Sequence, residues 1–194
     1  MANLIDIDIY KTSEKIESTK DDNRINTLIT SVSQLVKTYC GNSIVDHFSS
    51  NKTETFNITW GSNLAQLTES PVNSVVSVEE RENFSASYTT VPSTEYYLDG
   101  ATDSVYRVTT AGQSKNWPTG PASVRIVYKA GYATCPADLQ LAVIDLITYY
   151  LKDEHKARQT IAGASIQNNS SSSQRDNVAF PDHIKRVLDL YKNF

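Results

Sequence analysis

The sequence predicts an α+β fold in which a helical scaffold carries an inserted antiparallel β-region. Three observations lead to this prediction. Apolar residues recur at three- and four-residue steps near both ends of the chain, which is the period of an amphipathic helix. Residues 50–130 instead alternate between polar and apolar side chains, and a strongly apolar helical stretch follows them directly. The predicted parts are residues 1–48, 49–132 and 133–194.

The composition favours a folded protein without affinity for membranes or nucleic acid. The 194 residues are 39% hydrophobic and 21% charged, which is enough to form a core. The net charge is −4, and no run of Lys and Arg offers an electrostatic grip on phosphates. The N-terminus lacks the regions of a signal peptide, and the most apolar stretch, residues 139–151, is shorter than the ~20 residues of a membrane-spanning helix. We therefore expect synthesis in the cytoplasm.

A long helix is predicted to begin at Asp21 or Asp22 and to end at Gly41, which can adopt the left-handed conformation that terminates a helix. Its apolar residues share one stripe: Ile25, Leu28, Ile29, Val32, Leu35, Val36 and Tyr39. The opposite face is polar: Thr27, Thr30, Ser33, Gln34 and Lys37. A shorter helix is predicted over Tyr10–Ser18.

The β-region is predicted to contain short strands separated by turn residues. They are Thr53–Trp60, Val72–Val78, Tyr88–Val91, Glu95–Leu98, Val105–Val108 and Val124–Tyr128. Asp99 and Gly100 form a turn signal between two of them. The segment Trp117–Pro121 contains two prolines, which restrict φ and remove N–H donors. We therefore expect a rigid loop that leads into the last strand.

A second long helix is predicted to begin with Pro136 at its first helical position, where proline loses no helical hydrogen bond. Apolar residues cover most of its girth as far as Leu151, so we expect a buried central helix. Residues 163–177, rich in Ser and Asn, are predicted to form a mobile loop. A short last helix follows Pro181, and its apolar stripe contains Ile184, Val187, Leu188 and Tyr191.

No residue pattern points to catalysis. The three histidines, His47, His155 and His183, belong to no metal-ligand motif. The two cysteines, Cys40 and Cys135, lack the close spacing of a zinc knuckle or a disulfide framework. The sequence contains no nucleophile elbow, phosphate-binding loop or dinucleotide fingerprint. It therefore predicts no catalytic, cofactor-binding or metal-binding residue, and a protein that is not an enzyme.

Two neighbouring motifs carry a resemblance to a known family. Trp117-Pro118-Thr119-Gly120 precedes a strand that ends in Ala130-Gly131-Tyr132, and Pro136-Ala137-Asp138-Leu139 then opens the apolar helix. This order resembles the head-tail connector proteins of tailed bacteriophages, also called adaptor or head-completion proteins, and the first helix is similar as well. The resemblance covers residues 20–160.

The motif residues are interpreted as structural rather than catalytic. They are Trp117, Pro118, Gly120, Gly131, Tyr132, Pro136 and Asp138. Glycine at position 131 lets the strand turn sharply, and Tyr132 can cover that turn. Pro136 then starts the next helix without losing a hydrogen bond. We expect a structural corner at this point of the chain.

The resemblance implies a structural virion protein in the neck of the particle. Such proteins form a ring, commonly a dodecamer, beneath the portal. The ring extends the DNA channel, binds no specific DNA sequence, and provides a docking surface for the next connector or the tail-completion protein. The free protein could be a monomer that assembles only on the portal.

The C-terminal segment, residues 181–194, is implied to engage the portal. Its apolar residues are the candidate contacts: Ile184, Val187, Leu188, Tyr191 and Phe194. A short isolated helix needs some partner face, so the same stripe would also fit packing on the protein's own helices. The sequence leaves both alternatives open.

Two other classes of function also stay open. One is another virion component, such as a tail-completion or baseplate protein. The other is a small hydrolase or binding module that acts through the β-region, which would require a polar cleft with clustered titratable residues. The 11 tyrosines are typical of protein interfaces, and they fit ordinary packing as well.

Overall fold

The computed structural model describes residues 2–152, 158–161, 164–167 and 180–192. The chain divides into a helical unit, which comprises residues up to Gly41 and from Thr134 to Lys192, and a β-unit from Asn42 to Ala133. The predicted α+β class is confirmed. No helix in the described part of the chain combines the length and apolar character that a membrane crossing requires.

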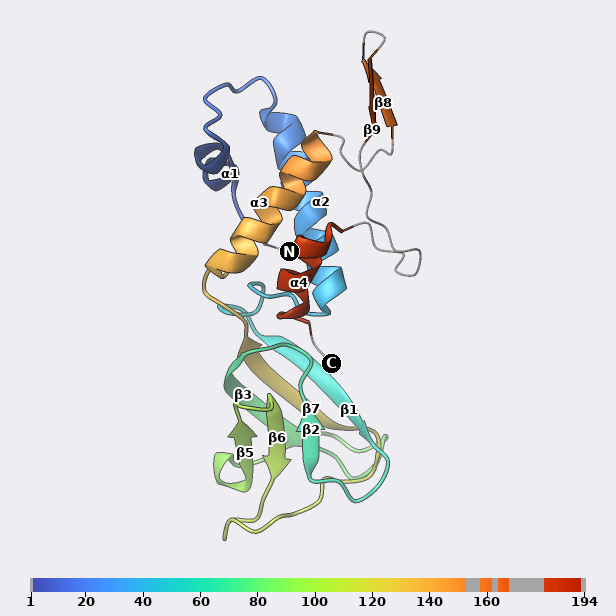
Figure 1. Cartoon of the computed structure of the whole chain (residues 1–194). Helices are drawn as coiled ribbons and strands as arrows, with labels where there is room; N and C mark the ends of the chain where they lie inside the picture. The colour runs from blue at the N-terminus through green and yellow to red at the C-terminus, as the bar shows by residue number, and fades with distance from the viewer. Residues whose placement is uncertain (1, 153–157, 162–163, 168–179, 193–194) are drawn as a thin grey trace. The chain divides into compact units, whose positions relative to one another are not determined.

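The helical unit is built around α2, α3 and α4, which pack against one another (Figure 1). Its helices are α1 (Ile7–Glu14), α2 (Asp22–Cys40), α3 (Ala137–Leu151) and α4 (Asp182–Asp189). Helix α2 ends at Gly41 with φ 66°, in the left-handed region, as its sequence predicts. Helix α1 begins earlier than expected, because the side chain of Asp6 caps it by accepting a hydrogen bond from the Ile9 N–H at 2.9 Å.

The polar face of α2 is less exposed than its sequence indicates. Ser33 and Lys37 are 2% and 5% exposed. The hydroxyl of Ser33 accepts a hydrogen bond from the N–H of Leu4 at 3.0 Å, and the Lys37 ammonium donates to the carbonyl of Ala2 at 2.6 Å. The N-terminal segment therefore covers this side of the helix. This cover could not be predicted, because residues 2–6 carry no periodic pattern.

Helix α3 is buried along most of its surface. Its buried residues are Leu139, Ala142, Val143, Ile144, Leu146 and Ile147. Among its large apolar residues, Leu141 is the exception, at 59% exposure. Pro136 occupies the N-cap position rather than the first helical position, with extended backbone (φ −55°, ψ 144°). The following helix still keeps its hydrogen bonds, because the Gln140 N–H donates to the Pro136 carbonyl at 2.8 Å.

The β-unit contains two antiparallel sheets. The larger has the strand order β1-β7-β3-β4: β1 (Lys52–Ile58), β7 (Gly120–Ala130), β3 (Val72–Glu80) and β4 (Thr89–Thr90). The smaller has the order β2-β6-β5: β2 (Leu64–Gln66), β6 (Ser104–Arg107) and β5 (Tyr96–Asp99), with the short 3-10 helix η1 (Ser93–Glu95) before β5. A single apolar core includes Val78 and Ile126 of the larger sheet and Val105 of the smaller one.

Three details of the β-unit differ from the sequence prediction. Strand β2 was not expected, because its three residues are too short to show a period. Strand β7 begins at Gly120, inside the segment expected to be a loop, because Gly120 pairs with Ile58 across an irregularity in the ladder. Ladder irregularities also break the alternation of β3, and Val76 is consequently 50% exposed.

A third pair of strands, β8 (Arg158–Ile161) and β9 (Ala164–Gln167), forms an antiparallel hairpin. Strand β9 occupies the beginning of the predicted mobile loop. Residues 163 and 168–177 of that loop lie outside the described residues.

Candidate functional site

Helix α4 is the element that the sequence resemblance singles out for partner binding. Ile184 and Leu188 are 1% and 0% exposed, so packing against α2 and α3 already buries them. Val187 and Tyr191 are half-buried, and Phe194 lies outside the described residues. For Ile184 and Leu188, the structure therefore favours the alternative in which the stripe packs on the protein's own helices.

Two hydrogen bonds between tyrosines and carboxylates hold the C-terminal segment on this unit. The hydroxyl of Tyr191 donates to Asp138 Oδ1 at 2.6 Å, and that of Tyr39 donates to Asp189 Oδ1 at 2.6 Å. We call these two bonds the α4 latch. The bond from Tyr191 holds the pKa of Asp138 below its usual value. The structure thus brings together Tyr191 and Asp138, which the sequence predicted for separate roles.

The side of α4 that faces solvent has a different chemistry from its buried stripe. Leu190, which directly follows the helix, is 77% exposed. His183 and Arg186 are also exposed. A partner that binds the helix as it lies here would contact these side chains together with the exposed Asp182 and Asp189.

The predicted corner at Gly131 and Tyr132 is built from backbone contacts. The Tyr132 N–H donates to the Ile44 carbonyl at 2.7 Å, and the Gly131 N–H donates to the Pro71 carbonyl at 2.8 Å. Gly131 has φ 95°, and a Cβ at this position would lie 2.3 Å from the Ile44 oxygen. Only glycine fits both the conformation and the space. Ile44, buried and with φ 67°, is a part of the corner that sequence reasoning missed.

The motif that begins with Trp117 is held in place by contacts inside the β-unit. Trp117 is 2% exposed, and its backbone N–H donates to the Ser62 carbonyl at 2.9 Å. Its ring lies 5.7 Å from the guanidinium carbon of Arg107, which is itself 2% exposed. Arg107 forms ion pairs with Glu80 and Glu95, each at 2.9 Å. This buried cation therefore joins β6 of the smaller sheet to β3 of the larger one.

Sequence reasoning missed Arg107, although its strand contained a signal. The residue follows Val105 at a two-residue step, which places both side chains on the same face of the strand. A charged residue in register with a buried valine indicates a buried partner of opposite charge.

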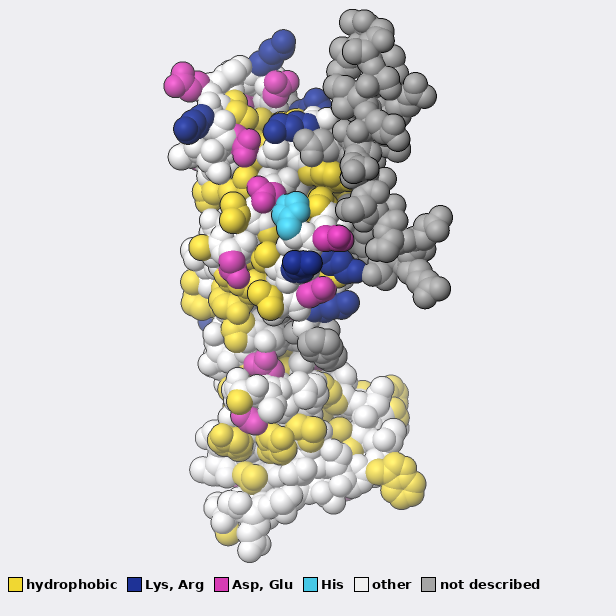
Figure 2. Space-filling model, viewed as in Figure 1, with side chains coloured by type: hydrophobic (Ala, Val, Ile, Leu, Met, Phe, Trp, Pro, Cys, Tyr) yellow, Lys and Arg dark blue, Asp and Glu magenta, His cyan; other side chains and the backbone are white. Residues whose placement is uncertain are grey.

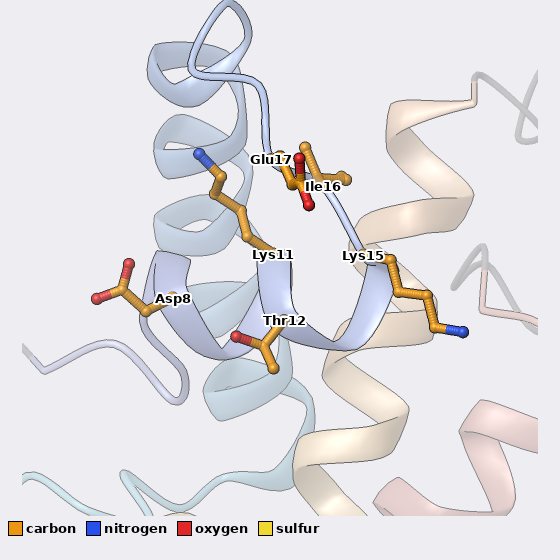
Figure 3. A pocket seen from close by; sticks show the side chains of 6 residues that line it. All are labelled: Asp8, Lys11, Thr12, Lys15, Ile16 and Glu17. Atoms are coloured by element: carbon orange, nitrogen blue, oxygen red, sulfur yellow. The ribbon is translucent and has the colours of Figure 1, made fainter.

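Two surface hollows among the described residues are candidate sites. One hollow of about 530 Å³ lies beside α1 (Figure 3). In this view the Asp8 carboxylate and the Lys15 ammonium point in opposite directions, and Lys11 is paired with Asp22 at 2.9 Å. Another, of about 700 Å³, lies in the β-unit between Glu80 and Thr119 and includes Trp117 in its lining. Of the charged residues in its lining, Glu80 is already paired with Arg107.

The remaining candidate groups for chemistry are dispersed or buried. In the described ranges, no three His, Cys, Asp or Glu side chains gather closely enough to hold a metal ion. Burial raises the pKa of Cys40 to about 11 and that of Cys135 to about 12, which disfavours the reactive thiolate. His183 is exposed, and His155 lies outside the described residues.

The comparison with protein families gives one match across nearly the whole chain. A family model described as "Head completion protein" matches residues 3–194. No curated protein sequence matches the chain.

Three solved structures share the fold of the chain. The first, described as the neck of an empty GTA particle computed with C6 symmetry, has a TM-score of 0.62 and 15% identity, covering 98% of this chain and 90% of the other. The second, the neck of a native GTA particle computed with C12 symmetry, has a TM-score of 0.56 and 16% identity, with coverages of 88% and 82%. The third, the virion of a native gene transfer agent particle, has a TM-score of 0.56 and 17% identity, with coverages of 91% and 80%.

Proposed function

The chain belongs to the head completion protein family, and on that premise we propose that its copies form a ring that joins the portal of a phage head to the tail or to the next connector. Membership confirms the resemblance carried by the sequence motifs. The protein is a structural component of the head-tail connection in the virion neck. In the proposed ring, DNA passes through the centre, and the protein acts by contacts rather than by catalysis.

The observation that carries this proposal is the extent of the family match, which spans the helical unit and the β-unit alike. The fold adds support, because the two similar necks were computed with sixfold and twelvefold symmetry. We propose twelve copies for this protein as well. Identical subunits joined head to tail close into a ring only when the rotation between neighbours fits. Free copies are therefore proposed to be monomers that assemble on the portal.

We propose that the portal contact uses the outward side of α4 and the residues after it. Leu190 supplies an exposed apolar anchor, and His183 and Arg186 flank it with polar groups. Half-buried Val187 and Tyr191 border this surface, and Phe194 follows it in sequence. Ile184 and Leu188 then contribute indirectly, because their burial fixes the position of the helix.

The charge of the chain suits a channel through which DNA must slide. The net charge of −4 gives the protein no general attraction for phosphate. Low affinity for DNA is useful in a channel through which the DNA must pass when it leaves the head. We propose that the central surface of the ring binds no particular DNA sequence.

Electron microscopy of the protein mixed with its portal tests the ring. Annular density on the outer end of the portal is the expected result, with twelvefold averages. A portal that stays bare at saturating protein, or density that appears only with tail components, would contradict the proposal and favour a tail-completion or baseplate role.

The portal contact is tested by the substitution Leu190→Asp. Binding to the portal should weaken at least about tenfold, since burying a carboxylate at an apolar anchor costs more than 1.4 kcal/mol. Leu141→Asp is the matched control, because Leu141 is also an exposed leucine of the helical unit. Equal loss of binding in both variants would show that α4 has no special role.

A further inference from the structure

A row of three large side chains crosses the smaller sheet of the β-unit. Leu64 of β2 pairs with Tyr106 of β6, and Tyr106 pairs with Tyr97 of β5, so the three lie side by side on one face. Leu64 is 36% exposed, Tyr97 is 59% exposed and Tyr106 is half-buried. We call these residues the apolar row.

The apolar row faces away from the core of the β-unit. Val105 and Arg107 alternate with Tyr106 along β6 and are 0% and 2% exposed, so the inner face of the sheet carries them. Figure 2 shows a band of hydrophobic side chains in the region where Figure 1 draws β2, β6 and β5. No Lys or Arg side chain is visible over these strands in that view.

One carboxylate borders the apolar row. Asp99 lies two residues after Tyr97 in β5 and so shares its face. Hydrogen bonds from the Thr102 hydroxyl and the Ala101 N–H hold the pKa of Asp99 below its usual value. The carboxylate therefore stays ionised at neutral pH and places a negative charge beside the aromatic rings.

A second surface of the β-unit has the complementary character. The loop of residues 81–88 presents Phe84 at 65% exposure. The guanidinium carbon of Arg81 lies 4.5 Å from the centre of the Phe84 ring and 4.6 Å from that of Tyr88, and Arg125 covers Tyr88 at 4.2 Å. Glu82 in the same loop is exposed, and Arg125 is paired with Glu79, so the cation that this surface offers is Arg81. We call the surface of Arg81, Phe84 and Tyr88 the basic loop.

The guanidinium of Arg81 is bound by backbone carbonyls. Its Nε–H donates to the carbonyl of Ala122 at 2.8 Å, and its Nη1–H donates to the carbonyl of Phe84 at 2.9 Å. Among the described residues, no carboxylate forms an ion pair with Arg81. The basic loop therefore offers a projecting aromatic ring beside a cation that is still available to a partner's carboxylate.

The basic loop begins on the opposite side of the smaller sheet from the apolar row. Arg107 extends from the inner face of that sheet and pairs with Glu80, the residue directly before Arg81. The basic loop thus begins on the inner side, whereas the apolar row lies on the outer side. Two separate surfaces of one chain can meet between copies, and such a contact repeats from one copy to the next.

We propose that neighbouring copies in the ring meet at these surfaces, with the basic loop of one copy packed on the apolar row of the next. Phe84 supplies apolar and aromatic contact with Tyr97 and Tyr106, and Arg81 approaches the Asp99 carboxylate of the other copy. The inference rests on the proposed ring and adds which residues make its repeating contact.

Cysteine cross-linking of assembled necks tests this pairing. One full-length chain carries Phe84→Cys and Tyr97→Cys, and the assembled rings are verified by electron microscopy before treatment with a bismaleimide. Cys40 and Cys135 should not react with the bismaleimide, because both are buried. A chain with Phe84→Cys and Leu141→Cys is the matched control, since Leu141 and Tyr97 are equally exposed at 59%.

The expected result is a ladder of covalent oligomers from the first chain and only monomers from the control. Each single-cysteine variant should also stay monomeric, because a head-to-tail contact brings no two equivalent positions together. Dimers from Phe84→Cys alone, or verified rings that give no ladder, would overturn the pairing and leave the ring standing. If no ring forms even from the unsubstituted protein on its portal, the proposed function fails and this inference fails with it.

Discussion

The helical unit and the β-unit are stabilised in different ways. In the helical unit, aliphatic side chains such as Leu139, Leu146 and Ile147 are fully buried and share the packing among many contacts. The β-unit also has an apolar core, but its two sheets are joined by a buried cation, Arg107, and its last strand ends in a turn that only Gly131 fits. One unit therefore spreads its stability over interchangeable residues, whereas the other depends on single residues that have no close substitute.

Gly131→Ala should break the β-unit most severely. The new Cβ would lie 2.3 Å from the Ile44 oxygen, and the left-handed backbone adds strain. Together these should lower the free energy of unfolding by about 3–4 kcal/mol. Chemical denaturation measures the change. The control is Gly112→Ala, since Gly112 has φ 77° but nothing within 4 Å, and it should cost only about 1 kcal/mol. Equal effects would mean that the close approach to Ile44 is unimportant.

Arg107→Met should have the next largest effect. Removing the guanidinium leaves Glu80 and Glu95 without their shared partner and removes the cation beside Trp117. Because both carboxylates reach the solvent edge, we expect a loss of about 2–3 kcal/mol, below the range for a fully buried pair. Lys115→Met is the control, because Lys115 is exposed, and its effect should stay within about 0.5 kcal/mol. If Arg107→Met leaves the free energy of unfolding unchanged, the β-unit does not depend on this residue, and the proposed difference between the two units is wrong.

Leu146→Met tests the other half of the comparison. Leu146 is 0% exposed in the centre of α3, yet methionine has a similar volume and adapts its shape. The free energy of unfolding should fall by about 1 kcal/mol, as for other volume-conserving changes. Thermal unfolding followed by circular dichroism at 222 nm, the usual helix band, would measure it. A loss as large as that of Gly131→Ala would show that the helical packing is equally intolerant.

Tyr191→Phe should have the smallest effect, and that effect should depend on pH. The variant loses one bond of the α4 latch, which is near the surface, so the cost should be below about 1 kcal/mol at neutral pH. The pKa of Asp138 is lower in the folded protein than in the unfolded chain, so the bond contributes above an unfolded pKa of about 3.9. Its contribution is lost as the pH falls through the lower, folded-state value.

The measurement is a set of urea titrations of both proteins between neutral and strongly acidic solution. The difference between them should shrink as the solution becomes acidic. Tyr97→Phe, at an exposed tyrosine of the β-unit, should show no difference at any pH. A Tyr191→Phe effect that is constant across the range would mean that Asp138 is not the acceptor that matters.

The sequence predicted the helical unit more accurately than the β-unit. The period of α2 and the cap at Gly41 are local features, and a single stretch of sequence contains all the information they need. Ser33 and Lys37 were misplaced because their partners, Leu4 and Ala2, belong to a distant and unpatterned segment. Contacts between residues so far apart in the chain produce no periodic pattern in the sequence.

Sequence-based prediction was less accurate for the β-unit and for the candidate site. Irregular pairing in β3 shifts Val76 to the surface, which strict alternation does not anticipate. The special role of glycine at position 131 could be predicted, but its neighbour Ile44 could not, because the two meet only in the folded chain. The apolar row likewise depends on cross-strand register, which no single segment specifies.

The hydrogen bond between the Tyr132 N–H and the Ile44 carbonyl, 2.7 Å long, has a consequence for how this protein can be altered. A second bond, from the Ala130 N–H to the His47 carbonyl at 3.0 Å, lies just inside it. The first and last segments of the β-unit therefore lie next to each other. Residues 42–133 should be exchangeable for the corresponding piece of a relative, or expressed alone, without stretching the connections that remain.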